Sequence, residues 1–327
     1  MYNEIKLNNR LYNITGKSFT KALAELDPDE EYEGTPLSGL DAYERQLKRF
    51  DTKVSGRDCD TVDKFFATSE TAVLFPEFVK RQISHGIDKY FALNNTAASV
   101  ITVDDTVYNS LSVTYPDNVN SVDEGAALPQ IVVKCKQASY ICKLGRELKL
   151  TYEVIRKRRL DTFAAILRQL GYSIAMCANN YAVTTIISGA GVTKEVAAAS
   201  FSYASLIEFW ASLADFQMDT IICSPANFAK ILQLSEIKNS SASGIDTENS
   251  VITLPFGLKI MAVQGYTGED MLGIAKDFAY ELAVCGDLTV DIDKLISTQY
   301  DQVGASMSVG VSSLNGKAIA KLTIKKA

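Results

Sequence analysis

The sequence predicts an α+β protein, in which helical and strand patterns follow one another along a single chain. Apolar residues recur at spacings of three and four through residues 160–188, as they do on one face of a helix. Residues 98–148 and 286–327 are strand-rich, whereas residues 200–285 mix short helical and strand patterns. The chain has 327 residues, which is enough for one large or two ordinary domains with a real core.

Residues 1–60 are predicted to form a poorly packed N-terminal arm. Residues 27–33 are mostly acidic, and prolines and a glycine interrupt this part of the chain. One short helix is expected over residues 40–50, because the apolar side chains there fall at helical spacing. Such a segment cannot bury a core alone, so we expect it to be disordered or laid against another surface.

Residues 61–97 contain one predicted helix, which starts near Pro76 and continues through Ile87. Proline fits the first turn of a helix, because its missing N–H would have no partner there. Residues 98–148 read as a long hairpin with a turn signal at residues 116–118. A two-stranded hairpin is marginal alone in water, so we expect it to lie on a partner surface.

Residues 149–199 hold the strongest helical pattern, and Gly189 is placed to end the helix predicted over residues 160–188. A coiled-coil strand is the less favoured alternative, because the apolar pattern covers few heptads and Gly171 interrupts it.

The last third of the chain is predicted to alternate short helices and strands. The elements expected in residues 200–285 are a helix over 205–214, a strand over 220–223, a helix opened by Ser224-Pro225, and strands over 251–254 and 258–263. In residues 286–327, Asn315-Gly316 predicts a type I′ hairpin between two alternating strands.

Composition excludes several classes of protein. The net charge of −6 argues against a dedicated nucleic-acid binder, although it allows loose contact with DNA. Residues 1–10 are polar, so no secretory signal is expected, and no apolar run approaches the ~20 residues that span a bilayer. The six cysteines show no CxxC spacing, so we expect buried apolar cysteines and no zinc or redox motif.

The residues that usually carry catalysis are sparse. The single histidine, His85, would have to serve any Ser-His-Asp triad, but charged neighbours suggest a solvated helix face. The glycine-containing segment 188–193 lacks the lysine of a P-loop. Paired carboxylates such as Asp104-Asp105 have no neighbours that would desolvate them. The sequence therefore predicts no enzyme, no cofactor and no metal site.

Residues 156–159 form the one dense basic cluster, Arg-Lys-Arg-Arg. Such a cluster could contact nucleic-acid phosphates or an acidic neighbouring subunit. It could also be a solvated turn before the long helix. We favour the solvated turn or the subunit contact over DNA.

Four short segments match sequence motifs of one protein family. They are Leu74-Phe75-Pro76-Glu77-Phe78, Glu124-Gly125-Ala126-Ala127-Leu128-Pro129-Gln130, Leu150-Thr151-Tyr152-Glu153-Val154-Ile155 and Ala275-Lys276-Asp277-Phe278. Their order, together with the arm, the hairpin, the long helix, the mixed region and the closing strands, resembles the phage capsid fold of the Hong Kong 97 type. The resemblance covers roughly residues 65–327.

The resemblance implies a division of the chain. The parts are an N-terminal arm (1–60), the first part of a peripheral domain (61–97), an extended hairpin loop or E-loop (98–148), the peripheral domain with its long spine helix (149–199), an axial domain (200–285) and closing strands of the peripheral domain (286–327).

The function implied is that of a major capsid protein, which self-assembles into hexamers and pentamers of an icosahedral head enclosing the phage genome. The residues expected at contacts between subunits are Asp123, Glu124, Gly125, Leu128, Pro129, Arg156, Arg158 and Arg159. Because some relatives crosslink through a lysine where this chain has Leu128, a non-crosslinked shell is expected.

The resemblance also implies partners and a location. Besides copies of itself, the chain is expected to meet a separate scaffolding protein, a portal protein and, loosely, packaged double-stranded DNA, but no membrane. It would be assembled in the cytoplasm of the bacterial host and reside in the virion. The alternatives are an encapsulin-type nanocompartment shell and, in a different class, an α/β enzyme built on residues 200–285.

Overall fold

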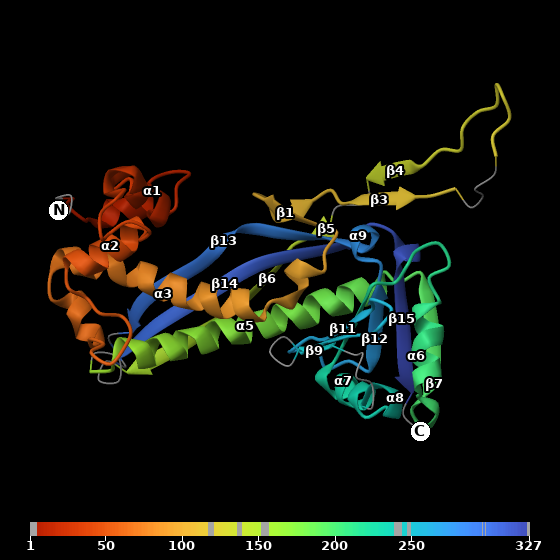
Figure 1. Cartoon of the computed structure of the whole chain (residues 1–327). Coiled ribbons are helices and arrows are strands. Elements are labelled where there is room, and N and C mark those ends of the chain that lie inside the picture. The colour runs from red at the N-terminus through yellow and green to blue at the C-terminus, as the bar shows by residue number, and fades with distance from the viewer. Residues whose placement is uncertain are drawn as a thin grey trace. The chain divides into compact units, whose positions relative to one another are not determined.

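The computed structural model describes residues 5–116, 121–135, 139–151, 157–238, 244–246, 250–295, 297 and 299–325. The chain divides into two compact units, and Figure 1 shows its elements. Unit 1 comprises Met1–Asp88, Gly145–Ser173 and Leu288–Ser306, and unit 2 comprises Lys89–Leu144, Ile174–Asp287 and Met307–Ala327. Each unit therefore gathers segments that are far apart in the sequence.

Unit 1 begins with short helices whose starts are set by polar side chains. They are η1 (Asn9–Asn13), α1 (Phe19–Leu26), η2 (Asp29–Tyr32), α2 (Ala42–Arg49) and η3 (Val62–Phe66). Ser18 caps α1, and Asp41 and Glu44 form a reciprocal capping box at the start of α2. The helix predicted over residues 40–50 is confirmed.

The expectation that this N-terminal region is poorly packed is wrong for its described residues. Leu23 and Tyr43 are buried, and the Arg45 guanidinium lies 3.0 Å from the Asp27 carboxylate with both side chains at most 1% exposed. Arg45 also lies over the ring of Tyr32, 4.4 Å from its centroid. An acidic stretch that looks solvated in the sequence is therefore partly neutralised inside the fold.

The helix α3 (Ser69–Tyr90) starts earlier than predicted, so Pro76 lies inside it and not in its first turn. A proline in a helix interior leaves backbone groups without partners. Here the Tyr12 hydroxyl donates to the Val73 carbonyl at 2.8 Å and accepts from the Glu77 N–H at 3.1 Å. Tyr12 thus bridges the helix turn that Pro76 opens, and burial raises the pKa of its hydroxyl.

The helix α5 (Leu160–Ser188) confirms the long helix predicted over the same residues. Within unit 1 it approaches α3 closely at two glycines. A Cβ on Gly171 would lie 2.2 Å from the Ile83 carbonyl oxygen, and one on Gly86 would lie 2.4 Å from that of Arg168. Gly171 therefore interrupts the apolar pattern because two helix backbones meet there.

Unit 2 contains a seven-stranded sheet in the order β7-β15-β12-β8-β11-β10-β9. Its strands are β7 (Val192–Ala197), β8 (Thr220–Cys223), β9 (Gly244–Asp246), β10 (Val251–Thr253), β11 (Lys259–Ala262), β12 (Asp270–Ile274) and β15 (Ile319–Lys325). The strand predicted over residues 220–223 is confirmed, and all four of its residues are buried.

Short helices accompany this sheet. They are η5 (Ala198–Ser200), α6 (Tyr203–Trp210), α7 (Pro225–Leu232), α8 (Ser235–Lys238), α9 (Lys276–Ala279) and η6 (Gly316–Ala318). The core joins apolar side chains of helices and strands, among them Leu206 and Phe209 of α6, Ile231 of α7 and Ile221 of β8. Pro225 opens α7 as predicted, whereas α6 ends at Trp210, before the predicted limit.

The remaining strands form a four-stranded sheet in the order β1-β13-β14-β6 and two small two-stranded sheets, β2-β5 and β3-β4. The bounds not yet given are η4 (Ala92–Asn95), β1 (Ser99–Val103), β2 (Val107–Tyr108), β3 (Leu111–Thr114), β4 (Val132–Cys135), β5 (Ser139–Tyr140), β6 (Cys142–Thr151), β13 (Tyr280–Leu295) and β14 (Tyr300–Ser313). No helix in the described ranges is long and apolar enough to cross a membrane.

The type I′ hairpin predicted at Asn315-Gly316 is wrong. The strands on its two sides join different sheets, since β14 belongs to the four-stranded sheet and β15 to the seven-stranded one. Asn315 has a φ of −139°, and its side chain accepts a hydrogen bond from the Lys317 N–H at 2.9 Å, which starts η6. A type I′ turn would need positive φ at its central residues, so the strand exchange between sheets overrides the local signal.

Candidate assembly surfaces

The predicted hairpin exists in unit 2. Strands β3 and β4 pair in antiparallel register, with Leu111 opposite Cys135 and Thr114 opposite Val132. The predicted turn at residues 116–118 lies largely outside the described residues. Figure 1 shows the two strands extending away from the rest of unit 2.

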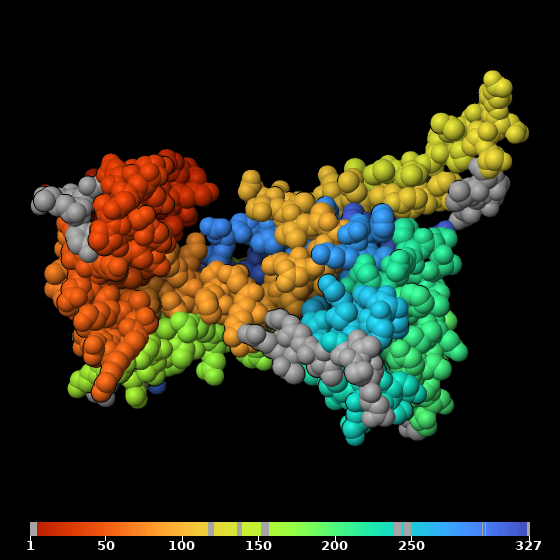
Figure 2. All heavy atoms as spheres, in the orientation of Figure 1, coloured from red at the N-terminus to blue at the C-terminus, as the bar shows by residue number. Residues whose placement is uncertain are grey.

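Apolar side chains on this hairpin are exposed to an unusual degree. All described residues from 121 to 135 are exposed. Leu128 is 75% exposed, Ile131 57% and Val133 56%. Val132, which points to the opposite side of the strand from Val133, is exposed as well, so apolar surface lies on both faces. Figure 2 shows this segment standing out in yellow. Exposed apolar groups gathered on one element are typical of a surface that another molecule covers.

A turn at the hairpin tip brings five predicted contact residues into one short segment. The Ala126 N–H donates to the Asp123 carbonyl at 3.0 Å, and Gly125 has a φ of +85°. Glycine is favoured in this conformation, because it has no Cβ. Asp123, Glu124, Leu128 and Pro129 are all exposed along the same segment. Their part in contacts between subunits stays a prediction.

Two further predicted contact residues, Arg158 and Arg159, lie in unit 1. Arg159 donates to Asp161 at 2.7 Å and to the Gly56 carbonyl at 2.9 Å, so its charge is engaged within the chain. The hydrogen bonds from Arg159 lower the pKa of the Asp161 carboxyl. The Arg158 side chain is exposed, and its carbonyl accepts from the Val62 N–H. Arg156 lies outside the described residues.

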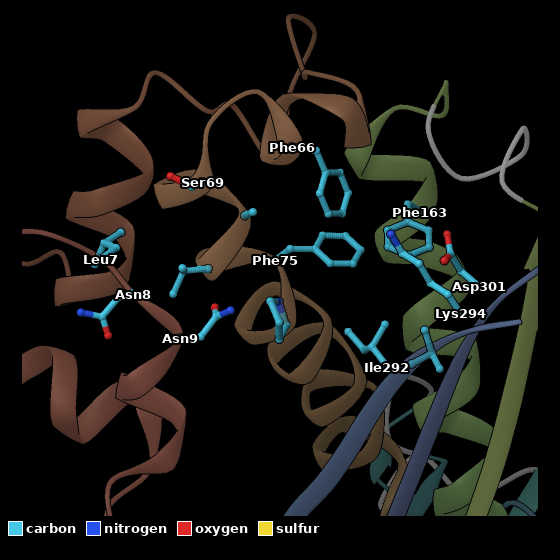
Figure 3. A pocket seen from close by; sticks show the side chains of 14 residues that line it. Leu7, Asn8, Asn9, Phe66, Ser69, Phe75, Phe163, Ile292, Lys294 and Asp301 are labelled. Atoms are coloured by element: carbon cyan, nitrogen blue, oxygen red, sulfur yellow. The ribbon is translucent and has the colours of Figure 1, made fainter. Parts of the chain in front are cut away.

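Unit 1 also contains a pocket that the sequence did not predict (Figure 3), with a volume of about 660 Å³. Three aromatic rings line it, with Phe75 5.1 Å from Phe66 and 6.0 Å from Phe163 between centroids. The remaining lining residues are Leu7, Asn8, Asn9, Ser69, Ala72, Val73, Pro76, Ile292, Lys294, Asp301 and Val303. Four distant segments build the pocket, and no local spacing in the sequence links them.

The described parts of the chain contain several side chains of the types that often carry chemistry. No group of three or more histidine, cysteine, aspartate or glutamate residues there could hold a metal ion. His85 is exposed on α3, as predicted. Burial raises the pKa of the Cys223 thiol to about 12, which keeps it in the unreactive protonated form.

The expectation that the cysteines are buried holds for Cys223 alone. Cys135 is exposed on β4, and the other four cysteines, Cys59, Cys142, Cys177 and Cys285, are half-buried. All six are free thiols. The exposed Cys135 belongs to the same hairpin as the exposed apolar residues, which explains why a residue type that is usually buried is open to solvent here.

Comparison with solved structures identifies the fold. The virus-like particle protein from Pyrococcus furiosus superposes with a TM-score of 0.55 at 14% identity, covering 75% of this chain and 98% of that chain. The protein of Microbacterium phage Oxtober96 gives 0.53 at 13% identity, covering 72% and 91%. The capsid of a native GTA particle gives 0.52 at 15% identity, covering 72% and 90%.

An encapsulin of Synechococcus elongatus also shares the fold, with a TM-score of 0.51 at 12% identity, covering 71% of this chain and 86% of that chain. At these identities the likeness concerns the fold alone. No curated protein sequence is significantly similar to this chain.

A family model described as phage capsid protein matches residues 141–287. This segment contains the long helix α5 and most of the seven-stranded sheet. The shared fold is that of Hong Kong 97-type phage capsid proteins, and the family match shows that residues 141–287, less than half of the chain, are similar to the phage capsid protein family.

Proposed function

We propose that copies of this chain assemble as hexamers and pentamers into a closed icosahedral head that encloses the phage genome. The observation that carries the proposal is the hairpin segment 121–135, which leaves Leu128, Ile131 and Val133 exposed in the single chain. A hairpin of two strands gains little stability by itself in water, so a neighbouring copy is the natural cover for these side chains.

The contacts proposed for this assembly follow the hairpin. Leu128 and Pro129 supply apolar surface, while Asp123 and Glu124 supply negative charge beside it. Because Leu128 has no amine, the tip holds the neighbour without a covalent bond at this position. Arg158 is a further candidate for contact, whereas Arg159 is already paired with Asp161 within the chain.

The proposed partners beyond the chain itself are a separate scaffolding protein, a portal protein and packaged double-stranded DNA. Contact with DNA would be loose, because the net charge of −6 provides no strong attraction for phosphates. Assembly would take place in the cytoplasm of the bacterial host. The role is structural and involves no reaction.

The experiment that tests the proposal is electron microscopy of the expressed chain, with and without a candidate scaffolding protein. The informative variant is Leu128→Asp, which places a charge on the hairpin tip. Its matched control is Leu26→Asp, because Leu26 is an exposed leucine at the end of α1 in the other unit.

We expect the unchanged chain and Leu26→Asp to form closed particles, and Leu128→Asp to reduce their yield at least about tenfold. The thermal midpoint of the unassembled chain should stay the same in both variants, because neither leucine is buried. Equal yields of particles from the two variants would exclude the hairpin tip as an assembly contact.

The second candidate function is the shell of an encapsulin-type nanocompartment, which the shared fold of the Synechococcus elongatus protein favours. Particles purified from their natural source separate the two functions. A genome-length DNA inside them would support the phage head, whereas protein cargo without DNA would support the compartment.

A further inference from the structure

Three aromatic rings meet at the root of the hairpin in unit 2. Tyr115 follows β3, Phe216 lies in the loop between α6 and β8, and Phe278 belongs to α9. The Tyr115 and Phe216 centroids are 5.8 Å apart in an edge-on arrangement, and those of Phe216 and Phe278 are 5.2 Å apart. Both distances fall in the range at which aromatic rings attract one another.

The central ring, Phe216, stands on a loop that is held firmly. The indole N–H of Trp210 donates to the Met218 carbonyl at 2.9 Å, which closes the loop across its base. Leu213 and Met218 on the same loop are buried in the core of unit 2. Phe216 is therefore presented to Tyr115 by a fixed part of the fold.

Backbone hydrogen bonds fasten the same root to α9. The Val113 N–H donates to the Leu314 carbonyl at 3.0 Å, and the Leu314 N–H donates to the Ala279 carbonyl at 2.9 Å. In addition, the Lys276 N–H at the start of α9 donates to the Asp219 side-chain carboxylate at 2.7 Å, which joins α9 to the end of the loop that carries Phe216. The strand β3 and the helix α9 are thus tied at their backbones as well as through the rings.

These rings are poorly placed to stabilise the core. Phe278 is 44% exposed, and Tyr115 and Phe216 are only half-buried. Because they pack against one another at the root of an exposed hairpin, these large side chains can instead fix the direction of that hairpin.

Direction matters because the hairpin acts as a lever. A segment of about ten residues is at most roughly 30–35 Å long when it is fully extended. A rotation of about 10° at its root would displace the far end of such a segment by up to roughly 5 Å, which is more than a well-packed contact between copies tolerates.

We propose that Tyr115, Phe216 and Phe278 form an aromatic bracket that fixes the direction in which the hairpin leaves unit 2. The three rings are positioning residues, which act on assembly through the hairpin tip. For its consequence in assembly the bracket depends on the proposed function, but its effect on the hairpin of the single chain does not.

The test compares Phe216→Ala with Phe256→Ala in the full chain. Phe256 is a matched control, because it is also half-buried in unit 2 and its ring packs on Trp210 with centroids 5.0 Å apart, so that its removal leaves the three bracket rings and the Trp210 hydrogen bond to the Met218 carbonyl in place. Tyr115→Ala is a second bracket variant in case Phe216→Ala does not fold, and Tyr115→Phe keeps the ring. Hydrogen exchange of the unassembled chain is measured in peptides covering residues 111–116, followed by imaging of the particles.

We expect Phe216→Ala and Tyr115→Ala to raise exchange at the Val113 amide by about threefold to tenfold. Phe256→Ala and Tyr115→Phe should leave it unchanged. The bracket variants should also yield fewer closed particles than Phe256→Ala at the same thermal midpoint.

The outcomes separate the bracket from the proposed function. Exchange in Phe216→Ala and Tyr115→Ala that matches Phe256→Ala would overturn the bracket, whatever the particles do. If the unchanged chain forms no particles but the bracket variants still raise exchange, the proposed function fails and the bracket stands.

Discussion

The N-terminal residues 5–60 and the hairpin residues 121–135 differ in where their side chains find partners. In the N-terminal region, Tyr12 bridges a turn of α3, and Arg45 is paired with Asp27 out of contact with water. In the hairpin, the described side chains are exposed, including the apolar ones. Both segments lie outside the seven-stranded sheet and α5. Only in the N-terminal segment do the side chains named here find partners within the chain.

The difference separates what holds the subunit together from what is left for assembly. A buried pair or a bridged helix turn contributes to folding, because the groups would lose their partners if the segment detached. An exposed apolar tip contributes nothing comparable to folding. It stabilises the protein only when another molecule covers it and removes its apolar surface from water. Changes in the N-terminal region should therefore lower the stability of the single chain. Changes in the hairpin should instead reduce assembly and leave that stability nearly unchanged.

The largest expected effect is that of deleting residues 1–55. The deletion uncovers α3, where Tyr43 donates to the Leu74 carbonyl at 3.4 Å and Thr20 donates to Glu77 at 2.7 Å. We expect the free energy of unfolding to fall by at least about 5 kcal/mol, which would leave unit 1 largely unfolded. Circular dichroism and hydrogen exchange of α3 would measure this.

The matched deletion is that of residues 121–130 in the hairpin. It should change the free energy of unfolding by less than about 0.5 kcal/mol, because it removes only exposed residues. A chain without residues 1–55 that stayed folded and merely failed to form shells would instead support the arm expected from the sequence, which is laid against another surface.

The next largest effect is expected for Arg45→Ala, which leaves the Asp27 carboxylate buried without its cation. The free energy of unfolding should fall by about 3–5 kcal/mol in urea denaturation. Replacing both residues of the pair by leucines should recover much of this loss, since burying two charges is itself costly. If the double variant is no more stable than Arg45→Ala, packing and not charge explains the effect.

The exposed pair of Lys17 and Glu25 serves as the control, because its 2.6 Å contact joins side chains that are 42% and 60% exposed. Lys17→Ala should cost less than about 1 kcal/mol.

A smaller loss is expected for Tyr12→Phe, which removes only the hydroxyl that bridges α3 at Pro76. The Val73 carbonyl and the Glu77 N–H then lack their partner, so the free energy of unfolding should fall by about 1–3 kcal/mol. Tyr300→Phe, at an exposed position on β14 in the same unit, should leave it unchanged. Equal urea midpoints for the two variants would mean that the helix closes its own turn without Tyr12.

Local patterns predicted the elements whose causes are local. The apolar stripe over residues 160–188 predicted α5, and the helix over residues 40–50 contains the Asp41 and Glu44 capping box that starts α2. The hairpin was predicted because alternating residues flank a turn signal, and its exposed tip follows from the same pattern. These features depend on residues a few positions apart.

The features that the sequence did not predict depend on residues far apart. Asp27 and Arg45 are 18 positions apart, and Tyr12 lies 61 positions before Val73. No spacing rule joins such residues, so the N-terminal region looked solvated and Pro76 looked like a helix start. The pocket of unit 1 and the rings around Phe216 were missed for the same reason.

At Asn315-Gly316 the sequence clearly favours a two-residue turn, but the pairing of the flanking strands determines the structure. The two flanking strands complete different sheets, and pairing them with each other would leave a gap in both. Tertiary pairing of whole strands outweighs the preference of a two-residue turn.

The smallest effect on folding is expected where Gly125 and Pro129 are both replaced by alanine. Alanine is strained at the φ of +85° that Gly125 adopts, so the tip should take up other conformations. Because a Cβ added at Gly125 would lie more than 4 Å from any described atom beyond its chain neighbours, the free energy of unfolding should change by less than about 0.5 kcal/mol. The yield of closed particles should nevertheless fall, since a neighbour would meet a tip of altered shape. Measuring the urea midpoint and the particle yield of one preparation tests both parts. Equal relative losses in the two quantities would show that the tip serves folding, and would remove the distinction between the two regions.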